Sequence, residues 1–231
     1  MITQTVQSML QQLSLLAPTA QNEAKIRSLV ADIYSLQNKI ENQKSDRNVI
    51  STCLNSLRTL ENNKCTCTQK CDYSFFDVAK LLENITLCSD ILLADTGYNI
   101  HFESERAEAS CCPQIIIDAF LNLISNSVKF GSGKSIEAEL TNRNGNVTVV
   151  VTNEGSLDFS KITPKSGIKT AANAAKLHHG RLFYSSCGKK VRAGFSLPCT
   201  LEPTIKFDVP AFSFYLEDNF SPVHVGLAGL F

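Results

Sequence analysis

The sequence predicts an α+β protein in which an N-terminal helical hairpin or bundle precedes a two-layer α/β sandwich. Residues 1–64 contain no glycine and one proline, and they are rich in Gln, Asn, Leu and Ile, which is typical of helix. From about residue 73, runs with helical spacing alternate with β-branched runs, which favours helices massed on one face of a sheet. We therefore expect a helical dimerisation stem at 1–64, the sandwich at 72–200 and a C-terminal extension at 201–231. In the extension we expect a strand and a short helix that pack on the body of the protein or on a partner.

The stem carries the pattern of a bundle or coiled-coil seam. Pro18 divides it, and five apolar residues after the break follow a heptad a/d pattern: Ile26, Leu29, Ile33, Leu36 and Ile40. Gln43 and Arg47 fall on the same seam, so the chain either turns there or continues as one helix with polar layers. A helix pair of this size cannot bury one apolar stripe alone, and we expect a homodimer through residues 1–64.

The predicted sandwich follows from periodicity and from the residues that start and end each element. Helical spacing runs over 75–94, 115–130 and 167–178. Pro113 stands where the second of these helices would start, and Gly131 can end it. Strands are expected at 98–104, 135–140, 147–153, 181–186 and 193–198. The run NRNGN lies between the second and third strands, and its Asn-Gly pair favours a tight hairpin.

Charge and hydropathy narrow the classes of partner. The chain has 22 basic and 22 acidic residues, so no net charge draws it toward nucleic acid, and we expect no nucleic-acid partner. No apolar run reaches the roughly 18 residues that span a bilayer. The polar start MITQTVQ has no signal-peptide pattern. These features predict a cytoplasmic protein without a membrane segment.

The chain has nine cysteines, which we expect to be free thiols in a reducing compartment. Cys65, Cys67 and Cys71 form a cluster, and the pair Cys111 and Cys112 follows further on. Together they offer enough thiolates for zinc. Their spacing, however, lacks the paired C-x-x-C units of common structural zinc sites, which favours the thiol interpretation.

A polar stripe interrupts the otherwise apolar helix predicted at 115–130. Asn122, Asn126 and Lys129 are four and three residues apart, hence on one face, and Phe130 follows them. Amide oxygens can ligate a hard cation, an ammonium group can meet phosphate, and an aromatic ring can pack on a base. The stripe therefore fits a magnesium-nucleotide site, while a solvated helix face remains the alternative.

Four motifs, taken in order, resemble the ATP-binding catalytic domain of bacterial sensor histidine kinases, the GHKL or Bergerat fold. NLISNSVKF (122–130) resembles the N-box of that family, and VVVTNEG (149–155) resembles its first glycine box. SGIKTAANAAKLHHGRL (166–182) resembles the second glycine box with its helix, and SSCGKKVRAGFSLP (185–198) resembles the last strands. The resemblance implies a two-layer sandwich of the histidine-kinase ATPase type, with ATP and Mg²⁺ as cofactors.

The resemblance also implies roles for the residues of the polar stripe. Asn126 would be the magnesium ligand and Asn122 the second asparagine of the N-box. Lys129 would contact phosphate, and Phe130 would form a wall of the adenine pocket.

In the glycine boxes the resemblance is less complete. Asn153 replaces the aspartate that receives the adenine amino group in the family, and its amide oxygen can accept that hydrogen bond without a charge. Gly155 and Gly167 would let backbone approach the nucleotide. Leu157 stands where the first box has its second glycine. Lys165 and Lys169 flank Gly167, where they either meet phosphate or form a solvated surface.

Two further departures concern catalysis. Only 11 residues separate Gly155 from Gly167, with Phe159 as their single aromatic residue, whereas the family has a longer lid there. A shortened lid should reduce catalysis more than binding. All four histidines lie outside the stem, so the stem lacks a phosphoacceptor histidine, and we interpret His178 and His179 as structural.

These features lead to a histidine kinase-like protein of a two-component system, with a degenerate ATP-binding domain that acts mainly by binding a response regulator or sensor kinase. The alternative is an active ATP-binding kinase module whose phosphoacceptor histidine lies on a missing segment or on another protein. A phosphotransferase of similar architecture ranks last, because it needs an exposed histidine on a helix.

Overall fold

The computed structural model describes residues 73–156, 166–199, 205–218, 221–227 and 230, with backbone only for 166–170. The chain divides into two compact units, Met1–Gln69 and Lys70–Phe231, and every described residue belongs to the second. The predicted stem, its dimer contact and the cluster of Cys65, Cys67 and Cys71 lie outside the described residues.

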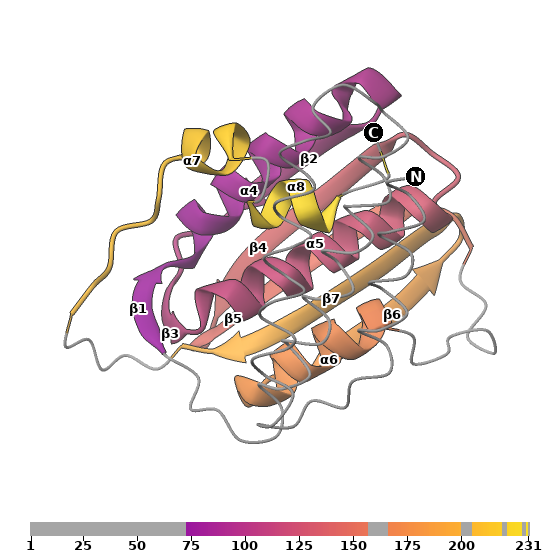
Figure 1. Ribbon diagram of the computed structural model, residues 1–231. Coiled ribbons are helices and arrows are strands. Elements are labelled where there is room, and N and C mark those ends of the chain that lie inside the picture. Colours follow the sequence, from indigo (N-terminus) through magenta and orange to yellow (C-terminus); the bar gives the residue numbers. More distant parts are fainter. Residues whose placement is uncertain (1–72, 157–165, 200–204, 219–220, 228–229, 231) are drawn as a thin grey trace, which may run out of the picture. The chain divides into compact units, whose positions relative to one another are not determined.

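A five-stranded sheet forms one layer, in the order β2-β4-β5-β7-β6 (Figure 1). Its strands are β2 Asn99–Ser104, β4 Ser135–Arg143, β5 Asn146–Glu154, β6 Leu182–Cys187 and β7 Lys190–Pro198. The pair β2 and β4 is parallel, and the remaining neighbours are antiparallel. Asn144 and Gly145 join β4 to β5 with φ angles of 51° and 73°, as a two-residue hairpin of this hand requires. The predicted Asn-Gly hairpin is confirmed.

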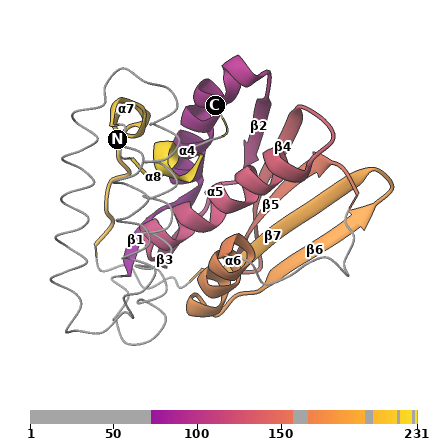
Figure 2. The ribbon, with the colours of Figure 1, turned by 45° about the vertical axis from the view of Figure 1, so that its right-hand side comes forward.

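Three long helices cover one face of this sheet: α4 Val78–Leu93, α5 Pro113–Phe130 and α6 Ser166–Leu177 (Figures 1 and 2). The opposite face carries the partly exposed ion pairs Glu137–Lys190 at 3.2 Å and Glu139–Arg192 at 3.8 Å. The apolar core lies between the helices and the sheet, and the predicted two-layer sandwich is confirmed. None of the helices in the described ranges is both long and apolar enough to cross a lipid bilayer.

Both ends of α5 match the sequence prediction. Pro113 occupies its first turn, where the missing N–H has no intrahelical partner to lose. Gly131 follows the last helical residue, and its N–H donates to the carbonyl of Ser127 at 2.9 Å. Between these ends the helix buries one side against the sheet through Ile116, Phe120 and other apolar residues.

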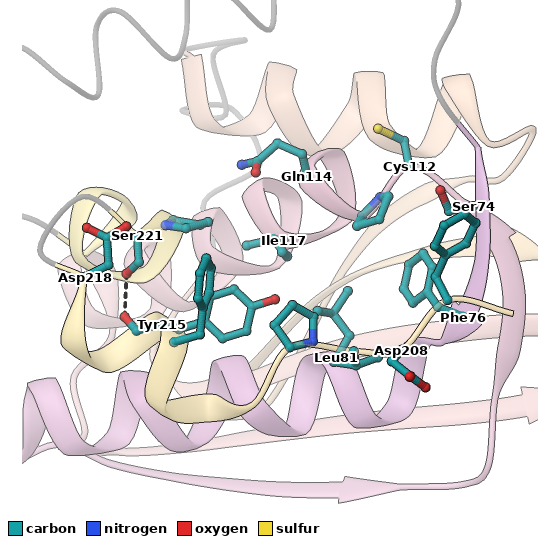
Figure 3. A pocket seen from close by; sticks show the side chains of 16 residues that line it. Ser74, Phe76, Leu81, Cys112, Gln114, Ile117, Asp208, Tyr215, Asp218 and Ser221 are labelled. Carbon is teal, nitrogen blue, oxygen red and sulfur yellow. Dashed lines mark hydrogen bonds between the residues drawn. The ribbon is translucent and has the colours of Figure 1, made fainter.

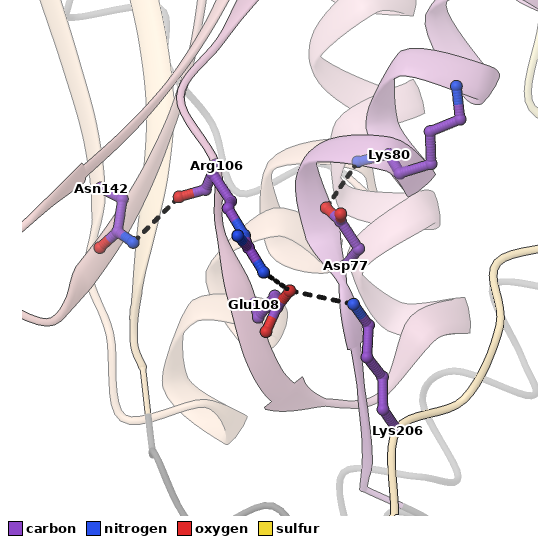
Figure 4. Close-up of polar contacts among 6 residues, drawn as sticks. All are labelled: Asp77, Lys80, Arg106, Glu108, Asn142 and Lys206. Carbon is purple, nitrogen blue, oxygen red and sulfur yellow. Dashed lines mark hydrogen bonds and ion pairs between the residues drawn. The ribbon is translucent and has the colours of Figure 1, made fainter.

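The first sandwich helix starts later than the sequence predicts. Helical spacing predicts a start at residue 75, which is wrong, because α4 begins at Val78. The preceding residues form a short strand, β1 Ser74–Asp77, which pairs antiparallel with β3 Glu108–Cys111. The Asp77 side chain accepts a hydrogen bond from the backbone N–H of Lys80 at 3.0 Å and caps the helix (Figure 4). The cap, rather than the apolar spacing, sets where the helix starts.

The C-terminal residues return to the helical layer. Lys206 forms an isolated bridge with Phe75 in place of the strand predicted for this region. Two short helices follow, α7 Phe212–Glu217 and α8 Pro222–Gly226. Figure 1 shows α7 beside α4, and α8 over α4 and α5.

Close contacts hold the C-terminal residues against α4 and α5. The Asn84 side chain on α4 donates to the carbonyl of Pro210 at 2.8 Å. On α8, a Cβ added at Gly226 would lie 2.9 Å from Cδ1 of Leu121, so the backbone of α8 packs directly on α5. Residues 205–218 and 221–227 are therefore part of the packed unit.

Candidate functional site

The polar stripe of α5 lies on the solvent side of that helix. Asn122 and Asn126 are half-buried and Lys129 is exposed. The Asn122 side chain donates to the carbonyl of Asp118, one turn earlier, at 2.7 Å. Within the described part of the chain, the Asn126 amide makes no hydrogen bond. Its oxygen can therefore accept a ligand or a cation, as the proposed magnesium role requires.

The end of α5 is joined to the end of β5 through side chains. The Ser127 hydroxyl lies 3.1 Å from both Oδ1 of Asn153 and the carbonyl of Leu123, and shares its single proton between these acceptors. The Asn153 Nδ2 group donates to the carbonyl of Glu154 at 2.9 Å. The Asn153 amide is thus held at both ends, with one lone pair and one N–H left for other partners.

Gly131 makes this junction possible. A Cβ at this position would lie 2.4 Å from the Ser127 carbonyl oxygen and 2.9 Å from Nδ2 of Asn153. The sequence predicts Gly131 only as a helix end, and it does not predict a role for Ser127. The available signal was that Ser127 is a hydroxyl on the sheet-facing side of α5, where a buried polar group needs a partner.

Gly155 lies next to this junction. Its N–H donates to the carbonyl of Lys189, in the turn between β6 and β7, at 2.8 Å. A Cβ at Gly155 would lie 3.4 Å from Nδ2 of Asn153 and 3.6 Å from the carbonyl oxygen of Phe130, which are ordinary contacts. Its described neighbours leave room for a side chain, so the expected need for glycine rests on the proposed nucleotide alone.

The remaining predicted site residues are less closely gathered. Phe130 ends α5, and the residue is 76% exposed. Gly167 lies in the first turn of α6. Leu157, Phe159 and Lys165 fall outside the described residues, and for Lys169 only the backbone is described. The structure thus brings the end of α5, which carries Asn126 and Phe130, next to Asn153 and Gly155 at the end of β5.

His178 links the start of α5 to the end of α6. Its Nδ1–H donates to the carbonyl of Ala174 at 2.7 Å, and its Nε2 accepts from the backbone N–H of Cys112 at 3.0 Å. The Tyr73 ring packs edge-on at a centroid distance of 5.4 Å. Burial lowers the pKa of His178, so the neutral ring is the folded form. The structural interpretation of this histidine is confirmed, while the neighbouring His179 is exposed.

Metal ligands of the usual acidic, thiol and imidazole types do not cluster in the described ranges. No group of three or more His, Cys, Asp or Glu side chains comes together there. The cysteines in those ranges are free thiols: Cys88, Cys111, Cys112, Cys187 and Cys199.

No protein-family model and no curated protein matches the chain. Many solved structures do match it in fold. The histidine kinase AdeS of Acinetobacter baumannii aligns with a TM-score of 0.53 and 16% identity over 86% of this chain and 95% of AdeS. Full-length ShkA in complex with AMPPNP aligns with a TM-score of 0.59 and 13% identity over 86% of this chain and 43% of ShkA.

A third similar structure is the histidine kinase ThkA in complex with the response regulator protein TrrA. It aligns with a TM-score of 0.54 and 18% identity over 84% of this chain and 65% of that chain. At these identities the likeness shows the fold, and it agrees with the resemblance seen in the sequence.

Proposed function

We propose that this chain, which has the fold of histidine kinase catalytic domains, is a signalling protein of a two-component system whose nucleotide site is degenerate. It binds magnesium-ATP weakly or not at all, and it acts mainly by binding a response regulator or a sensor kinase. The observation that carries the proposal is that Asn153 has an uncharged amide side chain whose oxygen already accepts a hydrogen bond from Ser127.

Asn153 occupies the position that the resemblance assigns to the adenine-binding aspartate. A carboxylate there would offer acceptors on both oxygens and a negative charge. Asn153 offers one amide oxygen, and Ser127 already donates to it at 3.1 Å. Hydrogen bonds to ionised groups are roughly twice as strong as neutral ones. Adenine recognition at this position is therefore weakened, because Asn153 offers fewer acceptors than a carboxylate and because its hydrogen bonds are weaker.

The partner class follows from the fold and from the histidines. The solved ThkA structure of similar fold contains a bound response regulator. In this chain the histidines are His101, His178, His179 and His224, all outside the stem. A stem that lacks a phosphoacceptor but dimerises through residues 1–64 would act by binding, and not by phosphorylating itself.

One observation favours a second candidate, an active ATP-binding kinase module whose phosphoacceptor is elsewhere. The Asn126 amide has no hydrogen-bond partner within the described residues, and Lys129 stands exposed one turn later. An amide oxygen that accepts no other bond can ligate magnesium, and an exposed ammonium group can contact phosphate.

Calorimetric titration of the full chain with magnesium-ATP separates the two candidates. We expect no saturable heat below millimolar nucleotide. Binding in the micromolar range that Asn126→Ala removes would overturn the degenerate-site proposal. Asn146→Ala is the matched control, because Asn146 is an exposed asparagine at the start of β5, at the β4–β5 turn. It should leave any heat unchanged.

A further inference from the structure

A pocket lies where the C-terminal residues cross the first turns of α4 and α5. None of the residues of the polar stripe lines it. Its volume is about 580 Å³ (Figure 3). It is lined from the body by Ser74, Phe76, Leu81, Cys112, Pro113, Gln114 and Ile117. The returning chain supplies Phe207, Asp208, Val209, Pro210, Phe214, Tyr215, Asp218, Ser221 and Pro222. A volume of several hundred Å³ with mostly apolar walls is typical of a ligand or peptide site.

The walls are mostly apolar, and the Tyr215 hydroxyl is a buried polar group that faces the interior. Figure 3 shows the Tyr215 ring with its hydroxyl directed into the pocket. The Tyr215 residue is 4% exposed, and the hydroxyl has no hydrogen-bond partner within the described residues. The hydroxyl is a protonated donor at neutral pH, and burial raises the pKa of Tyr215 further. A ligand that fills this pocket can accept a hydrogen bond here.

The charged residues that line the pocket are both acidic. Asp208 and Asp218 stand at opposite ends of it in Figure 3, and no Lys or Arg belongs to the lining. The nearest lysine along the chain, Lys206, is bound to Glu108 at 2.9 Å, and Arg106 binds the same carboxylate at 2.9 Å (Figure 4). Asp208 itself makes no ion pair within the described part of the chain. The pocket therefore favours a cation.

Exposed apolar side chains extend this surface beyond the pocket. Four of them belong to the C-terminal segment, with exposed fractions of 67% for Ile205, 54% for Phe207, 40% for Phe212 and 59% for Phe214. Phe207 and Phe214 also line the pocket, so this apolar border is continuous with it. Contiguous exposed apolar patches mark protein–protein interaction sites.

We propose that this pocket and its apolar border bind a short segment of a partner protein that combines a large apolar side chain with lysine or arginine. The apolar side chain fills the pocket over Ile117 and Leu81, and a backbone carbonyl accepts from the Tyr215 hydroxyl. The basic side chain meets Asp208 at the border. The site is separate from the nucleotide site, and it does not depend on whether ATP binds.

A second copy of this surface is a poorer occupant. In a two-fold contact the same patch faces itself, so Asp208 and Asp218 of one copy would approach the same carboxylates of the other. Like charges brought together at an interface cost free energy. A basic segment gains from the same carboxylates.

Selection of random twelve-residue peptides from a display library on the full chain tests the proposal. We expect the enriched peptides to share at least one aromatic or aliphatic residue next to Lys or Arg. A synthetic peptide of the enriched sequence, followed by fluorescence anisotropy, should bind Asp208→Lys about tenfold more weakly, because an attraction becomes a repulsion. Tyr215→Phe should also weaken binding, since it removes only the hydroxyl.

Glu217→Gln is the matched control, because Glu217 is exposed on the same segment but does not line the pocket. It should change affinity by less than about twofold. Absence of any enriched peptide, enriched peptides without basic residues, or unchanged affinity for Asp208→Lys would each overturn the proposal. Concentration-dependent dimerisation of the wild type that Asp208→Lys abolishes would assign the surface to a second copy instead.

Discussion

The backbone N–H of Cys112 donates to Nε2 of His178 at 3.0 Å, and this bond ties the residue before α5 to the residue after α6. The two residues lie 66 positions apart in the sequence. Because Nδ1–H is also bonded, to the Ala174 carbonyl, protonation of the ring would replace the Cys112 acceptor with a second donor.

This geometry predicts a pH-dependent stability. The pKa of His178 is lowered from 6.5 by burial, so below pH 6.5 the unfolded chain takes up a proton that the folded chain resists. The stabilisation is complete above pH 6.5 and is lost as pH falls toward the lowered pKa. Urea unfolding between about pH 7.5 and about pH 5 should show the free energy of unfolding falling. The fall should be smaller in His178→Gln. An equal fall in that variant would contradict the attribution of the pH dependence to His178.

Two glycines at the same junction should respond differently to a methyl group. In Gly131→Ala the Cβ meets the Ser127 carbonyl oxygen at 2.4 Å, and we expect a loss of about 1–3 kcal/mol in the free energy of unfolding. In Gly155→Ala the shortest contact is 3.4 Å, so the expected change is within about 0.5 kcal/mol. Urea denaturation of both variants measures the difference. Equal changes in the two variants would mean that the backbone around Gly131 shifts to accommodate the methyl group.

Asn153→Asp should restore part of the proposed nucleotide affinity. The new carboxylate can accept from Ser127 and still offer a charged acceptor to an adenine amino group. We expect the affinity for magnesium-ATP to rise by about fivefold to tenfold, as one stronger hydrogen bond provides, so that calorimetry shows binding in the variant at nucleotide concentrations where the wild type shows none. Ser127→Ala in the wild-type background isolates the contribution of the serine. No gain of binding in Asn153→Asp would argue against a base-recognition role at this position.

The C-terminal helix α8 should contribute to global stability. Val223 is fully buried, and Val223→Ala is expected to cost about 1–3 kcal/mol through lost burial and a residual cavity. Ile205→Ala removes a larger side chain from a position that is 67% exposed, and it should cost less than about 0.5 kcal/mol. Chemical denaturation compares the two. A neutral Val223→Ala would indicate that α8 detaches without affecting the body.

Local signals made much of the sandwich predictable. Pro113 and Gly131 bound a strongly periodic helix, and the Asn144–Gly145 pair dictates a tight hairpin by its φ angles alone. The strand β1 was missed because its four residues run directly into α4 and share its apolar spacing. Only the Asp77 cap separates the two elements, and a single aspartate within an apolar run is a weak signal.

The candidate site was predictable only in part. Spacing on one helix identifies Asn122, Asn126 and Lys129 as one stripe. The contact of Ser127 with Asn153 joins residues 26 positions apart on a helix and a strand, and it depends on how the two layers are packed together. The pocket lined by Asp208 and Tyr215 depends on where the chain returns, which no local pattern encodes.

The hydrogen bond from Asn84 to the carbonyl of Pro210 spans 126 positions in the sequence. During synthesis, α4 leaves the ribosome long before the residues that complete its surroundings. The apolar surface of α4 and α5 that α7 and α8 cover is thus exposed on the nascent chain until these two helices have been synthesised. Contacts of such long sequence separation slow folding, and a chain that stops before α7 leaves this surface uncovered.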